Sequence, residues 1–240
     1  QKMIPLESVM SKVWNKKIFE HIQKDVDKAS KDLAEERGAC PDAADYGIKE
    51  RFSNKTAIAP TASISIICGG TSPGVEPIAA NSFTHKTLSG SFNVRNRYLE
   101  KILEKHNKND DETWSSITTN QGSVSHLDFL TQQEKDVFKT AFELDQKWIV
   151  ELGADRTPHI SQAQSINIFV PADIHKKELH QIHFQAWKKG LKSLYYCRSK
   201  SIQRAENVND AKLTDVTANV YKSKNQQNEE QEYEECLSCQ

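Results

Sequence analysis

The sequence lacks any long apolar run. Its longest, at residues 64–68, is interrupted by Ser65, and it falls far short of the roughly 20 residues that a membrane-spanning helix needs. The first residues also lack the apolar region of a secretory signal. We therefore expect a cytoplasmic protein with no membrane partner.

An excess of charge of either sign is also absent, because 32 Lys and Arg stand against 33 Asp and Glu, for a formal net charge of -1. Affinity for the phosphate backbone needs an excess of basic charge, so the composition argues against a general DNA-binding protein. The apolar fraction is 37%, whereas soluble domains reach about 45–50% on a scale that also counts glycine. Either part of the chain is unpacked, or something outside the chain completes its core.

Cysteines are few and scattered, and their odd number makes a poor disulfide framework. We expect Cys40 and Cys68 to be buried as small hydrophobic residues. Only Cys236 and Cys239 have a meaningful spacing, close to the end of an acidic segment. Three interpretations stay open: a chance pair, part of a metal site that lacks its other ligands, and a redox dithiol on a mobile arm.

Periodic apolar residues predict three helices before residue 160, at residues 8–37, 94–106 and 131–153. The third begins with the capping-box pair Thr131 and Glu134 and is expected to end at Gly153. Residues 53–68 instead predict a short extended run, because β-branched isoleucines recur there.

A strand at residues 165–170, a helix at 174–189 and a strand at 192–198 follow with short connections. This order predicts a right-handed crossover between two parallel strands of an α/β sheet. It places residues 195–198 near the carboxyl end of a strand, where such proteins often carry their chemistry. Residues 1–202 are therefore expected to fold, and residues 203–240 to form a flexible acidic tail.

A run of hydroxyl-bearing residues is the first candidate site: Pro60, Thr61, Ala62, Ser63, Ile64 and Ser65. Hydroxyls and backbone amides can bind a phosphate without a lysine, although a polar strand edge is the commoner interpretation. For nearby Glu76, in the turn at residues 74–77, the sequence favours a solvated carboxylate over a role in orienting the loop.

Tyr195 and Tyr196 form the second candidate site. Adjacent strand residues point to opposite faces, so the simplest interpretation is one core ring and one surface ring. The functional alternative is redox chemistry, because neighbouring phenols can pass an electron and a proton between them. His183, next to Trp187 on a predicted helix, is expected to be a packed helix residue rather than a base.

Taken together, these features resemble the C-terminal portion of the large (α) subunit of class I ribonucleotide reductase. The resemblance covers nearly the whole chain, and its motifs occur in order: residues 3–8, 15–20, 33–38, 60–63, 74–77, 88–90, 161–168 and 183–192, followed by the tyrosine pair and the tail cysteines.

The resemblance implies the later strands and helices of a ten-stranded α/β barrel in residues 1–202, with a redox tail in residues 203–240. It implies that residues 60–65 hold the diphosphate of a ribonucleotide. Tyr196 would receive the oxidising equivalent and pass it to Tyr195, which would oxidise a catalytic cysteine. Cys236 and Cys239 would then re-reduce the active-site disulfide.

The implied partners are the N-terminal part of the large subunit, the small (β) subunit, thioredoxin or glutaredoxin, and a ribonucleoside diphosphate. The implied metal-radical cofactor belongs to the β subunit, and no cofactor is expected to be bound by this chain.

The sequence departs from the family in lacking the N-x-C-x-E arrangement of the catalytic cysteine, the earlier redox cysteine and the effector-binding regions. The chain is therefore expected to be inactive alone and poorly stable as an incomplete barrel. A non-catalytic fragment that binds nucleotide or the β subunit is the alternative. Less favoured are a cobalamin-dependent reductase, against which the tyrosine pair argues, and a zinc-binding adaptor.

Overall fold

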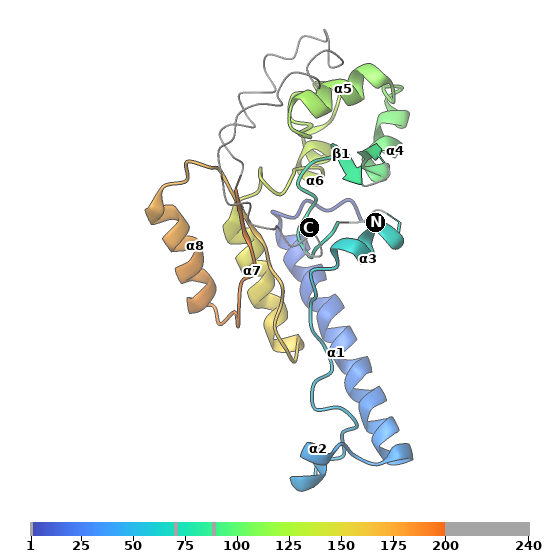
Figure 1. Cartoon of the computed structure of the whole chain (residues 1–240), viewed down its shortest axis with the longest axis vertical. Helices are drawn as coiled ribbons and strands as arrows, with labels where there is room; N and C mark the ends of the chain where they lie inside the picture. Colours follow the sequence, from blue (N-terminus) through green and yellow to red (C-terminus); the bar gives the residue numbers. More distant parts are fainter. Residues whose placement is uncertain (1, 70–71, 88–89, 200–240) are drawn as a thin grey trace, which may run out of the picture. The chain divides into compact units, whose positions relative to one another are not determined.

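A computed structural model describes residues 2–69, 72–87 and 90–199 (Figure 1). Among these residues, no helix combines the length and the apolar character that a bilayer crossing needs. The predicted tail, with Cys236 and Cys239, lies outside the described residues.

The first helix, α1 (Val9–Arg37), lies within the range predicted from the sequence and runs without a break. Its N-cap is Ser8, whose hydroxyl accepts the Ser11 N–H at 3.2 Å, and the chain leaves the helix at Gly38 with a φ of 83°. A short helix, α2 (Pro41–Asp45), follows. Several apolar side chains near the start of α1 are exposed: Val9, Met10, Val13, Trp14, Ile18 and Ile22.

The extended run predicted for residues 53–68 is only partly correct. Ile58 makes an isolated parallel bridge to Gln164, but the chain then turns into helix α3 (Ala62–Ile67). The Ser65 N–H donates to the Thr61 carbonyl at 2.8 Å, and the Ser65 hydroxyl donates to the Ala62 carbonyl at 2.7 Å. These local bonds outweigh the strand preference of the β-branched residues.

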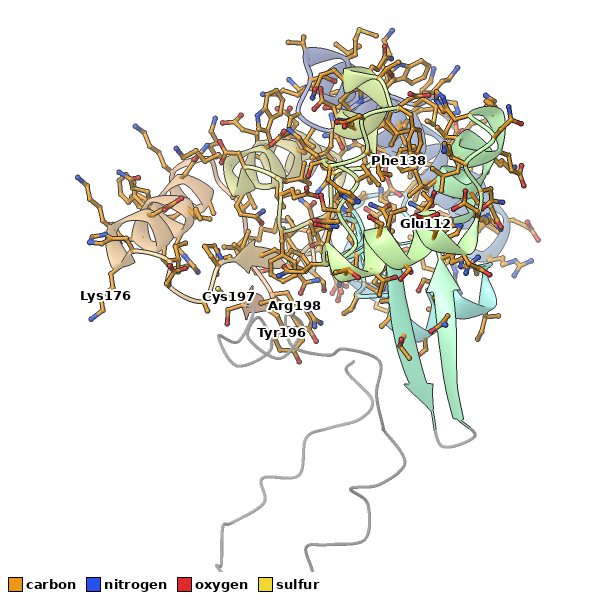
Figure 2. The ribbon with its side chains drawn as sticks, turned by 90° about the horizontal axis from the view of Figure 1, so that it is seen from above. Glu112, Phe138, Lys176, Tyr196, Cys197 and Arg198 are labelled. Atoms are coloured by element: carbon orange, nitrogen blue, oxygen red, sulfur yellow. The ribbon has the colours of Figure 1, made fainter. Side chains whose placement is uncertain are left out.

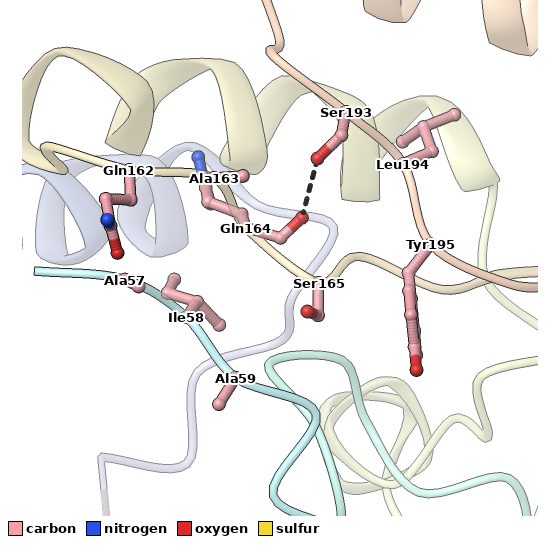
Figure 3. A pocket seen from close by; sticks show the side chains of 10 residues that line it. All are labelled: Ala57, Ile58, Ala59, Gln162, Ala163, Gln164, Ser165, Ser193, Leu194 and Tyr195. Atoms are coloured by element: carbon pink, nitrogen blue, oxygen red, sulfur yellow. Dashed lines mark hydrogen bonds between the residues drawn. The ribbon is translucent and has the colours of Figure 1, made fainter. Parts of the chain in front are cut away.

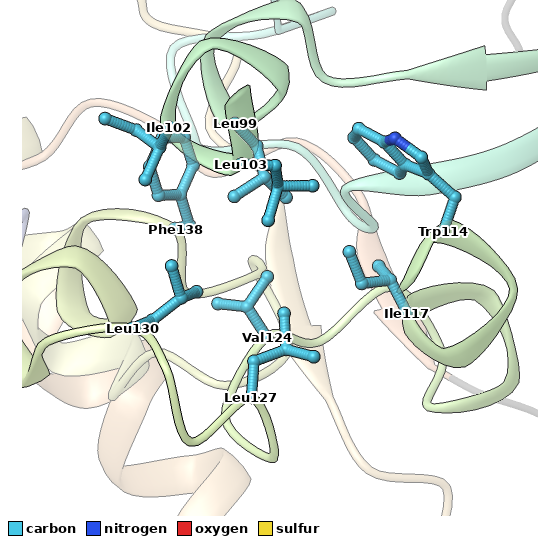
Figure 4. Close-up of a cluster of buried hydrophobic side chains, with 9 residues drawn as sticks. All are labelled: Leu99, Ile102, Leu103, Trp114, Ile117, Val124, Leu127, Leu130 and Phe138. Atoms are coloured by element: carbon cyan, nitrogen blue, oxygen red, sulfur yellow. The ribbon is translucent and has the colours of Figure 1, made fainter. Parts of the chain in front are cut away.

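Residues 82–138 hold an antiparallel hairpin and three helices. The elements are β1 (Ser82–Thr87), β2 (Gly90–Arg95), α4 (Arg97–Lys105), α5 (Asp111–Thr119) and α6 (Gln132–Val137). We call their buried cluster the helical core (Figure 4); it consists of Leu99, Ile102, Leu103, Trp114, Ile117, Val124, Leu127, Leu130 and Phe138. The sequence pattern predicts α4 but neither the hairpin nor α5.

The single helix predicted at residues 131–153 is in fact two. The capping box of Thr131 and Glu134 is present, but α6 ends at Val137, and α7 (Gln146–Arg156) begins after a turn. Asp145 caps α7 by accepting the Lys147 N–H at 2.9 Å. Gly153, the predicted helix end, lies inside α7, where a Cβ would come within 2.6 Å of the Ile166 side chain. Its role is close packing rather than helix termination.

The predicted strand–helix–strand unit is present as β3 (Ile168–Val170), α8 (Lys176–Lys188) and β4 (Cys197–Ser199), with β3 and β4 parallel. A 3-10 turn, η1 (Thr157–His159), links α7 to the strand region. Helix α7 contacts both α1 and α8 (Figure 1). We call the buried apolar cluster formed by β3 and the segments packed against it the sheet core. It consists of Leu144, Ile149, Val150, Ile166, Ile168, Val170, Ile182 and Ala186.

Candidate functional site

Three extended segments meet at one cleft of about 470 Å³. Residues 57–59, 162–165 and 193–195 line it, and Figure 3 shows the side chains of Ser165 and Tyr195 along it. The backbone of Ile58 is joined to the middle segment, because the Ser165 N–H donates to the Ile58 carbonyl at 2.9 Å. The cleft therefore brings one of the two candidate tyrosines next to the chain that leads into residues 60–65.

The hydroxyl-bearing run at residues 60–65 forms a turn and the first part of α3 rather than a strand edge. Thr61 has a left-handed φ of 52°, and its hydroxyl donates to the Pro73 carbonyl at 3.3 Å. Ser63 is exposed, whereas Ser65 is buried and its hydroxyl is used within the turn. Of the three predicted phosphate donors, Ser63 is thus the most accessible.

The two tyrosines lie just before β4, and the expectation of one core ring and one surface ring is wrong. Their exposures are 41% and 40%, and their ring centroids are 4.1 Å apart. The Tyr195 N–H donates to the Ile166 carbonyl at 2.8 Å, and the Ile168 N–H donates to the Tyr196 carbonyl at 2.9 Å. Both tyrosines therefore lie opposite the single residue Asn167, as in a β-bulge.

The bulge explains why neighbouring side chains can meet. In a regular strand, adjacent residues point to opposite faces, and an extra residue breaks that alternation. The guanidinium of Arg198 lies 5.4 Å from the centre of the Tyr196 ring (Figure 2). The site therefore presents two phenol rings in contact, with the guanidinium cation of Arg198 over the ring of Tyr196.

Glu76 is buried, with 4% exposure, and this contradicts the expectation of a solvated carboxylate. Its Oε1 accepts the backbone N–H of Asn167, and its Oε2 lies 3.4 Å from the Asn167 side-chain amide nitrogen. Gly74 makes room for it, since a Cβ at that position would clash with Oε2. The sequence places Glu76 in a turn but gives no signal that its carboxylate is buried.

A buried arginine on α7 supports the middle segment. Arg156 is 5% exposed, and it donates to Gln164 Oε1 at 3.0 Å and to Asn15 Oδ1 at 3.1 Å. Burial lowers the pKa of Arg156 to about 10, although the carboxylates of Glu76 and Asp155 oppose the shift. The side chain remains a cation at neutral pH.

Cys40, Cys68 and His183 lie outside this site, and the sequence predictions of their burial are wrong. Cys40 is half-buried and Cys68 is exposed, so neither is the buried residue that was expected. His183 is also exposed rather than packed, and its Nδ1 lies 2.8 Å from the Leu179 carbonyl. In the described part of the chain, no three His, Cys, Asp or Glu side chains gather in a way that could hold a metal ion.

Comparison with known proteins gives a consistent result. Residues 42–197 match the family model for the ribonucleotide reductase barrel domain. The chain is 48% identical over 212 residues to the ribonucleoside-diphosphate reductase large subunit of Invertebrate iridescent virus 6, covering 87% of this chain and 22% of that protein. It is 44% identical to the large subunit of Invertebrate iridescent virus 3, covering 89% of this chain and 34% of that protein.

A solved structure agrees with these relatives. The class Id ribonucleotide reductase α subunit of Actinobacillus ureae matches with a TM-score of 0.75 and 37% identity, over 85% of this chain and 37% of that one. The chain thus spans about a fifth to just over a third of the length of these proteins. Its parallel strands and covering helices are a portion of an α/β barrel, and the chain belongs to the ribonucleotide reductase large-subunit family.

Proposed function

We propose that the chain is the C-terminal part of a cytoplasmic ribonucleoside-diphosphate reductase large subunit. It acts only with the N-terminal part of that subunit and a small (β) subunit that carries the metal-radical cofactor. The chain itself holds no metal in this scheme. Residues 60–65 bind the diphosphate of the substrate, with the exposed Ser63 hydroxyl and neighbouring N–H groups as the first donors. The Thr61 and Ser65 hydroxyls join them by leaving the Pro73 and Ala62 carbonyls that they bind in the free chain.

The contact between the two phenol rings is the observation that carries this proposal. The centroid separation of 4.1 Å is short enough for one ring to exchange an electron and a proton with the other. Tyr196 loses both to the oxidant of the β subunit and then regains them from Tyr195. Tyr195 in turn takes an electron and a proton from a cysteine of the N-terminal part, and the thiyl radical abstracts the ribose 3′ hydrogen.

The tail cysteines close the cycle. Cys236 and Cys239 reduce the disulfide that forms in the active site, become a disulfide themselves, and are reduced by thioredoxin or glutaredoxin. A dithiol near the end of a polar segment suits this task, since it must reach both the active site and an external reductant.

The direct test is thioredoxin-dependent reduction of CDP by this chain mixed with its N-terminal counterpart and the β subunit, with each component omitted in turn. We expect turnover only in the full mixture. A folded complex of all components that does not turn over would instead support a non-catalytic fragment.

Substitution of Tyr196 tests the radical step. Tyr196→Phe keeps the ring but removes the phenolic O–H, so we expect turnover to be lost while nucleotide binding stays nearly unchanged. Tyr46→Phe is the matched control, because Tyr46 is 82% exposed and is not among the residues that line the cleft. Normal turnover in Tyr196→Phe would rule out its role.

The tail is tested with two reductants. An enzyme carrying Cys236→Ser and Cys239→Ser should stall with thioredoxin and keep turning over with a small dithiol that diffuses into the site. Equal loss with both reductants would contradict the shuttle role.

A further inference from the structure

We propose that Glu76 is a positioning residue for the tyrosine pair. Its carboxylate fixes Asn167, the residue opposite the β-bulge, and thereby keeps the two phenol rings in contact. The inference rests on the proposed function only where it concerns turnover, because the positioning itself is a property of this chain.

The backbone N–H groups around Asn167 point alternately to the two sides of the strand. The Ile168 N–H points to the tyrosine side, where it donates to the Tyr196 carbonyl at 2.9 Å. The Asn167 N–H points to the other side and has the Glu76 carboxylate as its acceptor.

Among the described residues, no strand continues the ladder on the Glu76 side of Asn167. The Ser165 N–H still finds a backbone acceptor, the Ile58 carbonyl, at 2.9 Å. At Asn167 the acceptor is instead a side chain from a distant turn, 91 residues away in sequence. The Glu76 carboxylate therefore replaces a strand at the position where the bulge needs a fixed partner.

The contact between Glu76 and Asn167 is buried. Glu76 is 4% exposed and Asn167 is 8% exposed, so water is a poor substitute for the carboxylate. If the acceptor is withdrawn, the buried N–H loses its partner and the strand must shift to find another. The bonds at Ile166 and Ile168 that define the bulge would shift with it.

The hydrogen bonds that hold the nucleotide loop do not involve the Glu76 carboxylate. The Ser72 hydroxyl donates to the backbone carbonyl of Glu76, and the Thr61 hydroxyl donates to the Pro73 carbonyl at 3.3 Å. Neither bond uses the Glu76 side chain. A change of that side chain should therefore leave the loop in place and act mainly on the tyrosines.

Two substitutions distinguish reach from charge. Glu76→Asp keeps the charge but withdraws the carboxylate by one methylene, whereas Glu76→Gln keeps the reach and removes the charge. The amide oxygen of Gln can accept the Asn167 N–H. The Asn167 side chain can then turn its Oδ1, which has no hydrogen-bond partner among the described residues, toward the new amide N–H.

The same strand offers a matched control. Gln146 is also buried, and its Oε1 accepts the Phe169 N–H at 2.8 Å. Gln146→Asn shortens this contact by the same methylene, but two residues away from the position opposite the bulge. It should loosen the Phe169 amide and leave the tyrosine pair in place.

The first measurement is amide hydrogen exchange in the 240-residue chain. We expect the Tyr195 amide to exchange about 10-fold faster in Glu76→Asp, and within about 3-fold of the wild-type rate in Glu76→Gln and Gln146→Asn. An unchanged Tyr195 rate in Glu76→Asp, or an equal acceleration in Gln146→Asn, would overturn the inference.

The second measurement is turnover in the completed reductase. We expect kcat to fall about 10-fold in Glu76→Asp with KM for the nucleotide unchanged. In Glu76→Gln, which keeps the reach of the side chain, we expect kcat to stay close to the wild-type value. A change in KM alone would contradict positioning of the tyrosines. If the wild-type mixture does not reduce CDP, the proposed function fails, and the exchange rates still decide whether Glu76 positions the pair.

Discussion

The helical core and the sheet core differ in how much of their surroundings this chain supplies. The buried side chains of the helical core all come from residues 99–138, which are continuous in sequence (Figure 4). Among the described residues, Met3 is the one partly buried apolar side chain packed against this core from outside that stretch. The sheet core lies behind two short parallel strands and draws on residues as far apart as Leu6 and Leu194. Large apolar side chains also stay exposed on α1 and α8, including Trp187 at 73%.

The difference reflects the two kinds of architecture. Helices joined by short connections can bury one face against each other within a single stretch of chain. A parallel sheet needs further strands at its edges, and a barrel exists only once it is closed. A chain that spans about a fifth to a third of its relatives therefore contains one nearly self-sufficient core and one that more chain must complete.

The largest effect is expected from Trp114→Ala in the helical core. Trp114 is 2% exposed, so its truncation should cost about 3–5 kcal/mol of stability in that core. Trp187→Ala on α8 is the matched control and should change stability by less than about 0.5 kcal/mol. Chemical denaturation together with hydrogen exchange of residues 97–138 measures both. Equal losses would mean that burial of Trp114 in the helical core does not set the cost of its truncation.

A smaller effect, in the sheet core, is expected from Gly153→Ala. The added Cβ would lie 2.6 Å from Ile166 Cδ1 and 3.2 Å from Leu191 Cδ2, and such overpacking costs about 1–3 kcal/mol. Ile166→Val removes the Cδ1 atom, so the double variant should be more stable than Gly153→Ala alone. Denaturation midpoints of the four proteins give the coupling, and simple additivity would exclude the contact as the cause.

The smallest effect is expected from pH and falls on the helical core. Burial and the Lys135 ammonium lower the pKa of His126 from its usual 6.5, although Asp128 opposes the shift. The folded state therefore binds the proton less readily than the unfolded chain. Its contribution to stability is complete above pH 6.5 and declines as the pH falls toward the folded pKa.

His126→Gln isolates this contribution. Wild-type protein should lose stability in the helical core between about pH 7.5 and about pH 5.5, and the variant should lose less. Denaturation midpoints measured at both values provide the comparison. Parallel losses in the two proteins would assign the pH dependence to other groups.

Local signals in the sequence were sufficient where the structure is local. The periodicity of α1, the capping box at Thr131 and the crossover from β3 to β4 were all predicted. Each depends on residues within one or two turns of each other, or on the short connections of a crossover unit.

The errors arose where distant contacts decide the structure. The break between α6 and α7 depends on the cap that Asp145 provides. Gly153 was predicted to end a helix, because its packing partner Ile166 lies on another segment and could not be identified from the neighbouring residues. Glu76 has no sequence signal for burial, because its acceptor role is defined by Asn167 on another segment. The contact between the tyrosine rings could not be predicted from regular strand alternation, because a bulge interrupts that alternation.

Because of the β-bulge, one tyrosine of the pair can be removed from the chain without a change in the register of β4. Two residues occupy one position opposite Asn167, while Cys197 pairs with Ile168 in regular register. Deletion of either tyrosine would therefore remove the extra residue, leave one aromatic ring, and still allow Cys197 to keep its partner. A protein engineer could in this way shorten the aromatic pair to a single ring without shifting the strand that follows.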